Sequence, residues 1–191
     1  LREKYDFVLA GKTGGDCVAD PRLAPLLARR LLETGASAII DIYELHKHER
    51  LLFVQRFLDA LLNAPKELWH PALIIVDEAH IFAPEGGKAE SAQAVIDLMT
   101  RGRKRGFCGV LATQRISKLS NDAAAEANNK LIGRSALDID TKRAADELGF
   151  VGRADQLALR DLEVGRFYCF GPALMPGPTL IHVGAVETTQ P

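Results

Sequence analysis

The stretch Leu73-Ile-Ile-Val-Asp77-Glu78-Ala-His80 decides the fold of this chain, because a short apolar run in it ends in two adjacent carboxylates. Four apolar residues in a row are typical of a strand inside a parallel sheet. The two carboxylates then lie at the carboxyl end of that strand, where ligands of parallel sheets bind. The stretch therefore predicts an α/β fold with a functional site at Asp77 and Glu78.

Apolar runs and amphipathic stretches alternate on both sides of this strand. Strands are expected at 7–10, 36–41, 73–76, 109–113, 130–137, 166–170 and 179–183. Helices are expected at about 20–33, 47–63, 89–100, 122–128, 140–148 and 154–159. The alternation predicts a mostly parallel sheet with helices on both faces, followed by a C-terminal β-hairpin whose loop is rich in Pro and Gly.

Composition limits the class of protein. The chain has 191 residues, of which 47% are hydrophobic and 26% charged, and this indicates a soluble globular domain and excludes a fibre or a disordered tail. The net charge of -1 means that attraction to nucleic acid must come from local clusters of basic residues. The three cysteines show no metal-binding or disulfide spacing, which favours the cytoplasm. No apolar run is long enough to span a bilayer, so no membrane is expected as a partner.

The Asp-Glu pair has the form of a Walker B motif. Chemistry on a nucleoside triphosphate needs one carboxylate for Mg²⁺, and Asp77 fits this role. A second acid can orient or deprotonate the attacking water, and Glu78 fits that one. The alternative is a strand that ends in a solvated acidic turn. His80 follows directly, and it either couples the nucleotide site to a partner or DNA or has a plain packing role.

A basic turn, Arg101-Gly-Arg-Lys-Arg-Gly106, lies between this strand and the next. Its arginines could enter the phosphate site of a neighbouring subunit and stabilise the charge of the transition state. A solvated basic turn and a contact with DNA phosphates are the alternatives. The position between two core strands favours the contact with a neighbouring subunit.

Two further stretches bear on the phosphates. The strand Gly109–Thr113 ends at Gln114, whose amide is a candidate sensor of the γ-phosphate, although an ordinary polar strand end is the alternative. The stretch Gly11-Lys-Thr-Gly-Gly-Asp16 lacks the first glycine of a P-loop, and its two later glycines oppose the helix that a P-loop requires. We interpret Gly11–Asp16 as a structural turn.

Taken together, DEAH at 77–80, RGRKRG at 101–106 and LATQR at 111–115 resemble the FtsK/HerA superfamily of P-loop ATPases, and within it the HerA-like group. The resemblance covers about residues 7–184 and implies a RecA-like core, a homo-oligomer in the form of a hexameric ring, and ATP with Mg²⁺ as cofactors. It also implies an ATP-driven translocase or helicase-like motor that acts on double-stranded DNA, in some cases with a nuclease.

The resemblance also implies roles for single residues. By this resemblance, Asp77 takes the position of the carboxylate that binds Mg²⁺, and Glu78 takes that of the catalytic base. Gln114 takes the position of the sensor, and Arg103 takes that of the arginine finger that is supplied to the active site of the neighbouring subunit. Arg101 and Arg105 are the second candidates for the finger, and His80 is a secondary candidate for the site.

The family's Walker A P-loop is expected upstream of residue 7. We therefore expect 1–186 to be a RecA-like ATPase domain without its N-terminal Walker A portion, and 187–191 to be a polar tail. The full-length protein is then expected to be an ATPase, whereas the 191 residues alone are expected to be inactive. A non-catalytic DNA-binding or assembly module and a conjugative-type pumping ATPase are the alternatives.

Overall fold

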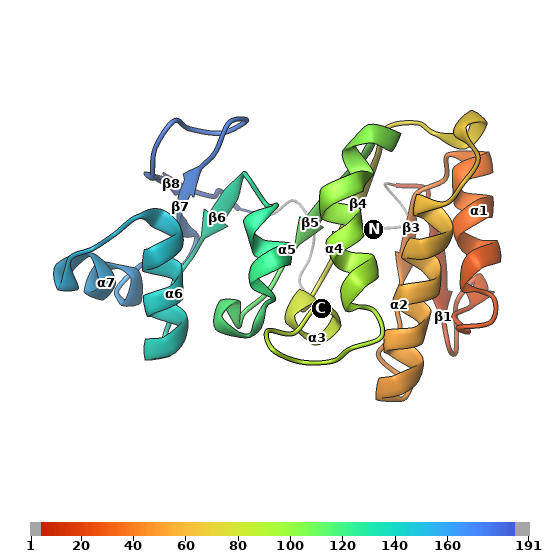
Figure 1. The fold of residues 1–191 in the computed structure, drawn as a ribbon, viewed down its shortest axis with the longest axis horizontal. Helices are drawn as coiled ribbons and strands as arrows, with labels where there is room; N and C mark the ends of the chain where they lie inside the picture. The colour runs from red at the N-terminus through yellow and green to blue at the C-terminus, as the bar shows by residue number, and fades with distance from the viewer. Residues whose placement is uncertain (1–4, 186–191) are drawn as a thin grey trace.

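The computed structural model describes residues 5–185 and shows an α/β chain (Figure 1). The predicted polar tail, 187–191, lies outside the described residues. The strands are β1 Val8–Gly11, β2 Cys17–Val18, β3 Ala38–Ile40, β4 Ala72–Val76, β5 Phe107–Leu111, β6 Lys130–Ile132, β7 Arg166–Phe170 and β8 Thr179–His182. The α-helices are α1 Ala24–Thr34, α2 Lys47–Leu62, α3 Ala79–Phe82, α4 Ala92–Arg101, α5 Asn121–Ala125, α6 Asp138–Leu148 and α7 Arg153–Arg160. Short 3₁₀ helices are η1 Lys66–Leu68, η2 Gly102–Arg105 and η3 Ile116–Lys118.

The described strands form two parallel sheets and one antiparallel sheet, where a single mostly parallel sheet was expected. β1 lies between β2 and β3 and is parallel to both, and β4 is parallel to β5. β6, β7 and β8 form an antiparallel sheet in that order, in which β7 and β8 are the predicted C-terminal hairpin. Parallel sheets with crossing helices and closing antiparallel strands confirm the α/β fold class.

The largest hydrophobic cluster lies between the parallel strands and the helices α1, α2 and α4. Leu58 of α2 and Leu98 of α4 are each 1% exposed at its centre. α2 has nearly the predicted limits because its ends are fixed locally. The backbone amide of His46 donates to the carboxylate of Glu49 at its start, and Pro65 follows its end.

Helices cover one face of the parallel strands, on the near side in Figure 1. On the other face, Leu73 and Ile75 of β4 are 62% and 63% exposed, and Val110 of β5 is 40% exposed. The expectation of helices on both faces is thus met on one face only, within residues 5–185. An unbroken apolar run indicates that both faces of a strand can be buried, but it does not show that helices pack against both faces.

Several boundaries differ from those expected. α1 begins at Ala24 and not near residue 20. The carboxylate of Asp20 accepts a hydrogen bond from the backbone amide of Arg22, and this forms a turn before the helix. Its end at Gly35, with φ 64°, agrees with the prediction. β5 begins at Phe107, two residues before the expected start. The one-turn helix α3 and the two-residue strand β2 were not expected.

The C-terminal part has its own small core, which joins α6 and α7 to the antiparallel strands. Beside it, Glu147 of α6 forms ion pairs with Lys130 of β6 and with Arg143, in which the Glu147 side chain is 14% exposed. Across the described ranges, no helix has both the length and the apolar character needed to cross a membrane.

Candidate functional site

The predicted site residues after β4 and β5 meet at one edge of the parallel sheet. Val76, the last residue of β4, lies opposite Leu111, the last residue of β5. Asp77 and Glu78 follow the first of these strands, and Gln114 follows the second after two residues. The parallel register therefore brings three of the predicted residues together at the carboxyl ends of the strands.

Glu78 has an unusual backbone. Its φ of 48° and ψ of 43° are left-handed, and it is the one residue other than glycine with a positive φ in the described part. Such a conformation costs of the order of 1 kcal/mol and occurs often at functional sites. The backbone amide of Glu78 donates to Oδ1 of Asp77 at 2.9 Å, which holds the Asp77 carboxylate against the backbone of Glu78.

The side chain of Glu78 contacts both strand ends. Nε2 of Gln114 donates to Oε1 of Glu78 at 3.1 Å. The other oxygen, Oε2, is buried and has no hydrogen-bond partner among the described residues. Nδ1 of His80 lies 3.3 Å from that oxygen without making a hydrogen bond to it. The Glu78 carboxylate is therefore held at one oxygen and has unused accepting capacity at the other.

His80 joins the two predicted motifs. Its Nδ1 lies 2.9 Å from Oγ1 of Thr113, the residue before Gln114, and its side chain is 20% exposed. His80 therefore lies at the site, between the loop after β4 and the loop after β5.

The carboxylates fit a magnesium ion. The Asp77 side chain is exposed at the edge of the sheet, and carboxylate oxygen is a ligand that Mg²⁺ prefers. Oε2 of Glu78 has no partner among the described residues and keeps the capacity to accept a hydrogen bond. Mg²⁺ in triphosphate sites takes one or two carboxylates, with phosphates and water supplying the other ligands, so the Asp-Glu pair is sufficient for this chemistry.

The basic turn lies at the opposite edge of the sheet. η2 and Gly106 directly precede β5, whereas Glu78 follows β4, and the two strands are parallel. The five residues of β5 separate the two edges by about 15 Å. Arg103 and Glu78 of one chain are therefore not brought together.

The three arginines of the turn differ in their contacts. Arg101 forms an ion pair with Asp97 at 2.5 Å, and Arg105 donates to the carbonyl of Arg101 and stacks on the ring of Trp69 at 5.3 Å. Arg103 is exposed and makes no side-chain hydrogen bond or ion pair with any residue in 5–185. Of the three, Arg103 has the side chain that is available to a second molecule.

The stretch Gly11–Asp16 is a turn, as predicted, and no helix begins at its lysine. It connects β1 to the parallel strand β2, which was not expected. The carboxylate of Asp16 accepts a hydrogen bond from the backbone amide of Leu9 at 2.8 Å. A Cβ atom at Gly15 would lie 2.7 Å from the carbonyl oxygen of Leu9. Packing of the turn therefore requires a glycine at this position.

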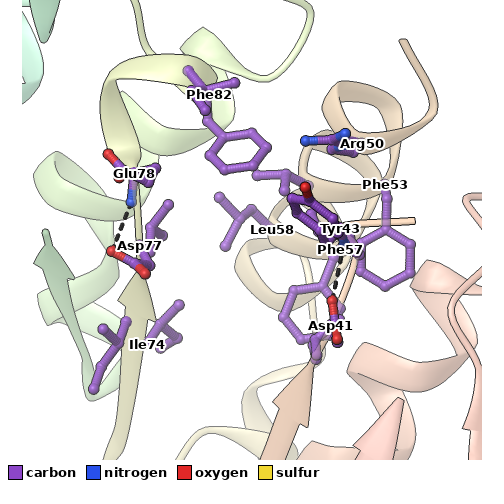
Figure 2. A pocket seen from close by; sticks show the side chains of 16 residues that line it. Asp41, Tyr43, Arg50, Phe53, Phe57, Leu58, Ile74, Asp77, Glu78 and Phe82 are labelled. Carbon is purple, nitrogen blue, oxygen red and sulfur yellow. Dashed lines mark hydrogen bonds between the residues drawn. The ribbon is translucent and has the colours of Figure 1, made fainter. Parts of the chain in front are cut away.

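A cleft of about 450 Å³ lies between β3 and β4 and reaches the site (Figure 2). Asp41, which follows β3, lies across it from Asp77, and side chains such as Phe57, Leu58 and Phe82 make its lining mostly apolar. Asp41 was not predicted from the sequence as a residue near the site. Its signal is the same as that of Asp77, an acid directly after an apolar strand.

A second missed residue is Asp140, in the first turn of α6. It is 2% exposed, and it accepts hydrogen bonds from Arg115 and from the backbone of Ser117, just beyond Gln114. The sequence carries no signal for this contact, because an acid in the first turn of a helix is ordinarily a surface residue.

Residues 28–147 match the protein family described as Zonular occludens toxin (Zot). Among curated proteins, the chain is 31% identical over 127 residues to the probable DNA double-strand break repair helicase HerA of Methanocaldococcus jannaschii, covering 65% of this chain. It is 40% identical over 67 residues, 35% of this chain, to the DNA double-strand break repair helicase HerA of Pyrococcus furiosus. The matches span only 25% and 12% of these two relatives.

Solved structures share the fold at low identity. The genome packaging NTPase B204 of Sulfolobus turreted icosahedral virus 2, in complex with ATPγS, has a TM-score of 0.60 and 12% identity over 96% of this chain and 85% of that chain. The bacterial conjugative coupling protein TrwB has a TM-score of 0.59 and 16% identity over 85% of this chain and 45% of that chain.

Proposed function

Because the chain belongs to the Zonular occludens toxin (Zot) family and is a P-loop ATPase of the FtsK/HerA type, we propose that it is the catalytic part of an ATP-driven motor that moves double-stranded DNA. The observation that carries this proposal is the hydrogen bond between Gln114 and Glu78. This hydrogen bond joins an acidic side chain that follows β4 to an amide side chain that follows β5. Both lie at the carboxyl ends of the strands, where parallel sheets bind ligands.

In this proposal Asp77 holds the Mg²⁺ that accompanies ATP, and the ion, when bound, neutralises charge on the β- and γ-phosphates. Glu78 accepts a proton from the attacking water at Oε2, the oxygen without a partner among the described residues. Gln114 holds the other oxygen of Glu78, so a movement of its amide toward the γ-phosphate would change the position of the base. His80 limits the movement of Glu78 from the other side.

Arg103 completes the site of the neighbouring copy. Its place at the opposite edge of the sheet and its lack of partners within residues 5–185 support this role over Arg101 and Arg105. A site shared between two copies requires head-to-tail contacts, which form a ring where the rotation between copies closes. We therefore propose a homo-oligomeric ring, hexameric as in the FtsK/HerA type, that works on DNA in the cytoplasm, with a nuclease as a further candidate partner.

The test is Mg²⁺-dependent ATP hydrolysis by the full-length protein, with and without double-stranded DNA. We expect turnover that DNA stimulates and that the substitution Glu78→Gln abolishes. The change keeps the hydrogen bond to Gln114 possible but removes the basic carboxylate. A folded wild-type protein without turnover would overturn the proposal in favour of a non-catalytic DNA-binding or assembly module.

A further inference from the structure

Asp140 is the one buried acidic residue of the described part of the chain. Its carboxylate lies in the first turn of α6, at 2% exposure, and accepts two hydrogen bonds. The backbone amide of Ser117 donates at 2.8 Å, and Nε of Arg115 donates at 3.1 Å. A buried carboxylate is costly without such partners, so both donors are held firmly in place.

The charge state of Asp140 agrees with this geometry. Burial by itself would raise the pKa of Asp140, but its interactions with Ser117 and then with Arg115 outweigh burial and lower that pKa below its ordinary value. The carboxylate therefore stays ionised at neutral pH and forms a charged pair with Arg115.

The two donors hold the segment that carries the sensor. Arg115 directly follows Gln114, and its backbone amide donates to Oγ1 of Thr113 at 3.0 Å. The amide of Gln114 then reaches Glu78 at 3.1 Å. A continuous path of hydrogen bonds and adjoining residues thus leads from Asp140 on α6 to the Glu78 carboxylate.

We propose that Asp140 is a positioning residue that sets the place of Gln114 by holding Arg115 and the backbone of Ser117. The proposal rests on the proposed function, because it gives Gln114 its role at the reacting phosphate. Asp140 does not touch the site itself. It connects the sensor to α6 and to the small C-terminal core, so a movement of that part of the molecule changes the alignment of Gln114 and Glu78.

A purely structural ion pair is the alternative, and the same helix provides the control. Glu147, also on α6, is paired with Lys130 and Arg143 and has no contact with the sensor segment. A substitution of Glu147 weakens the attachment of α6 to the rest of the molecule. It leaves intact the hydrogen bonds that Arg115 and Ser117 donate next to Gln114. Loss of stability alone would then affect the variants Asp140→Asn and Glu147→Gln alike.

The experiment measures kcat and KM for ATP with the full-length wild type and with Asp140→Asn, Gln114→Ala, the double variant and Glu147→Gln. We expect Asp140→Asn to lower kcat about tenfold, the size expected for loss of one charge-assisted hydrogen bond that aligns a catalytic group, with KM little changed. In the Gln114→Ala background the same change should cause no further loss, since the sensor is already absent. Glu147→Gln should keep kcat within about twofold of wild type.

The outcomes separate the two proposals. If the wild type hydrolyses ATP and Asp140→Asn lowers kcat equally with and without Gln114, the positioning role is wrong and the proposed function stands. An unchanged kcat in Asp140→Asn leads to the same conclusion. If the folded wild type does not hydrolyse ATP, the proposed function fails and the positioning role fails with it.

Discussion

Gln114 and Glu78 are 36 positions apart in the chain, yet the amide of the first donates to the carboxylate of the second at 3.1 Å. The contact exists because β4 and β5 are parallel and end opposite each other. Nothing local to either segment would produce it, since Gln114 is otherwise an exposed residue in a loop. The contact also makes the position of the acid depend on that of the amide.

For the proposed catalytic base, the change Glu78→Gln should lower kcat by at least about 100-fold, the usual contribution of general-base catalysis. ATP binding should be kept, because Asp77 remains in place. Nucleotide affinity and ATP hydrolysis, each measured on the full-length protein, check the two halves of this expectation. The matched control is Glu126→Gln at an exposed carboxylate after α5, which should leave both quantities unchanged.

For the proposed arginine finger, Arg103→Ala should abolish hydrolysis, and mixing it with the equally inactive Glu78→Gln variant should restore part of the activity. A mixed interface can combine an intact Glu78 from one copy with an intact Arg103 from the other. Lys104→Ala, an exposed cation next to Arg103, is the control and should remain active alone. Mixtures as inactive as their components would exclude a shared site.

For the turn at Gly11–Asp16, Lys12→Ala should change KM for ATP less than about twofold, because the turn does not have the form of a phosphate-binding loop. In contrast, Gly15→Ala should lower the free energy of unfolding by about 1–3 kcal/mol, since its Cβ would meet the Leu9 carbonyl oxygen at 2.7 Å. ATP titrations and denaturant unfolding test the pair. A large loss of ATP affinity in Lys12→Ala would contradict our interpretation of the turn.

For stability against pH, Glu147 is the informative residue. Burial raises its pKa, but Lys130 and Arg143 together outweigh burial and lower the pKa below the ordinary value of 4.5. The folded protein therefore binds fewer protons there than the unfolded chain does. The stabilisation is complete above the ordinary pKa and is lost as the pH falls through the folded one.

Glu147→Gln should accordingly lower the free energy of unfolding by about 2 kcal/mol at pH 7, and by progressively less as the pH falls below 4.5. Urea unfolding at a series of pH values measures this difference. Glu163→Gln removes the more exposed ion pair with Arg166 and should have an effect below about 1 kcal/mol. A difference between wild type and Glu147→Gln that grows toward low pH would show that the sign is wrong.

The sequence predicted the parts of the fold that depend on local pattern. α2 and the strand before Asp77 were located within a residue or two, because capping residues, proline and apolar periodicity mark their ends. The meeting of Glu78 with Gln114 could also be anticipated, since parallel strands place their carboxyl ends at one edge. The site residues there followed from this rule.

Features that depend on tertiary contacts could not be predicted. The burial of Asp140 requires that α6 packs beside the loop after β5, and no pattern in either segment encodes that contact. The left-handed backbone of Glu78 likewise results from the structure around it. The exposure of Leu73 and Ile75 could not be predicted, because the apolar sequence of the strand is the same whether helices cover one of its faces or both.

The separation of Arg103 from Glu78 by the length of a strand has a consequence for assembly. If each active site needs both residues, an open row of copies always has one incomplete site at its end, and a single copy has none that is complete. Closing the row completes the last site. The proposed ATPase activity per molecule should therefore rise steeply with protein concentration and reach a plateau once rings predominate, so that dilution alone would abolish it.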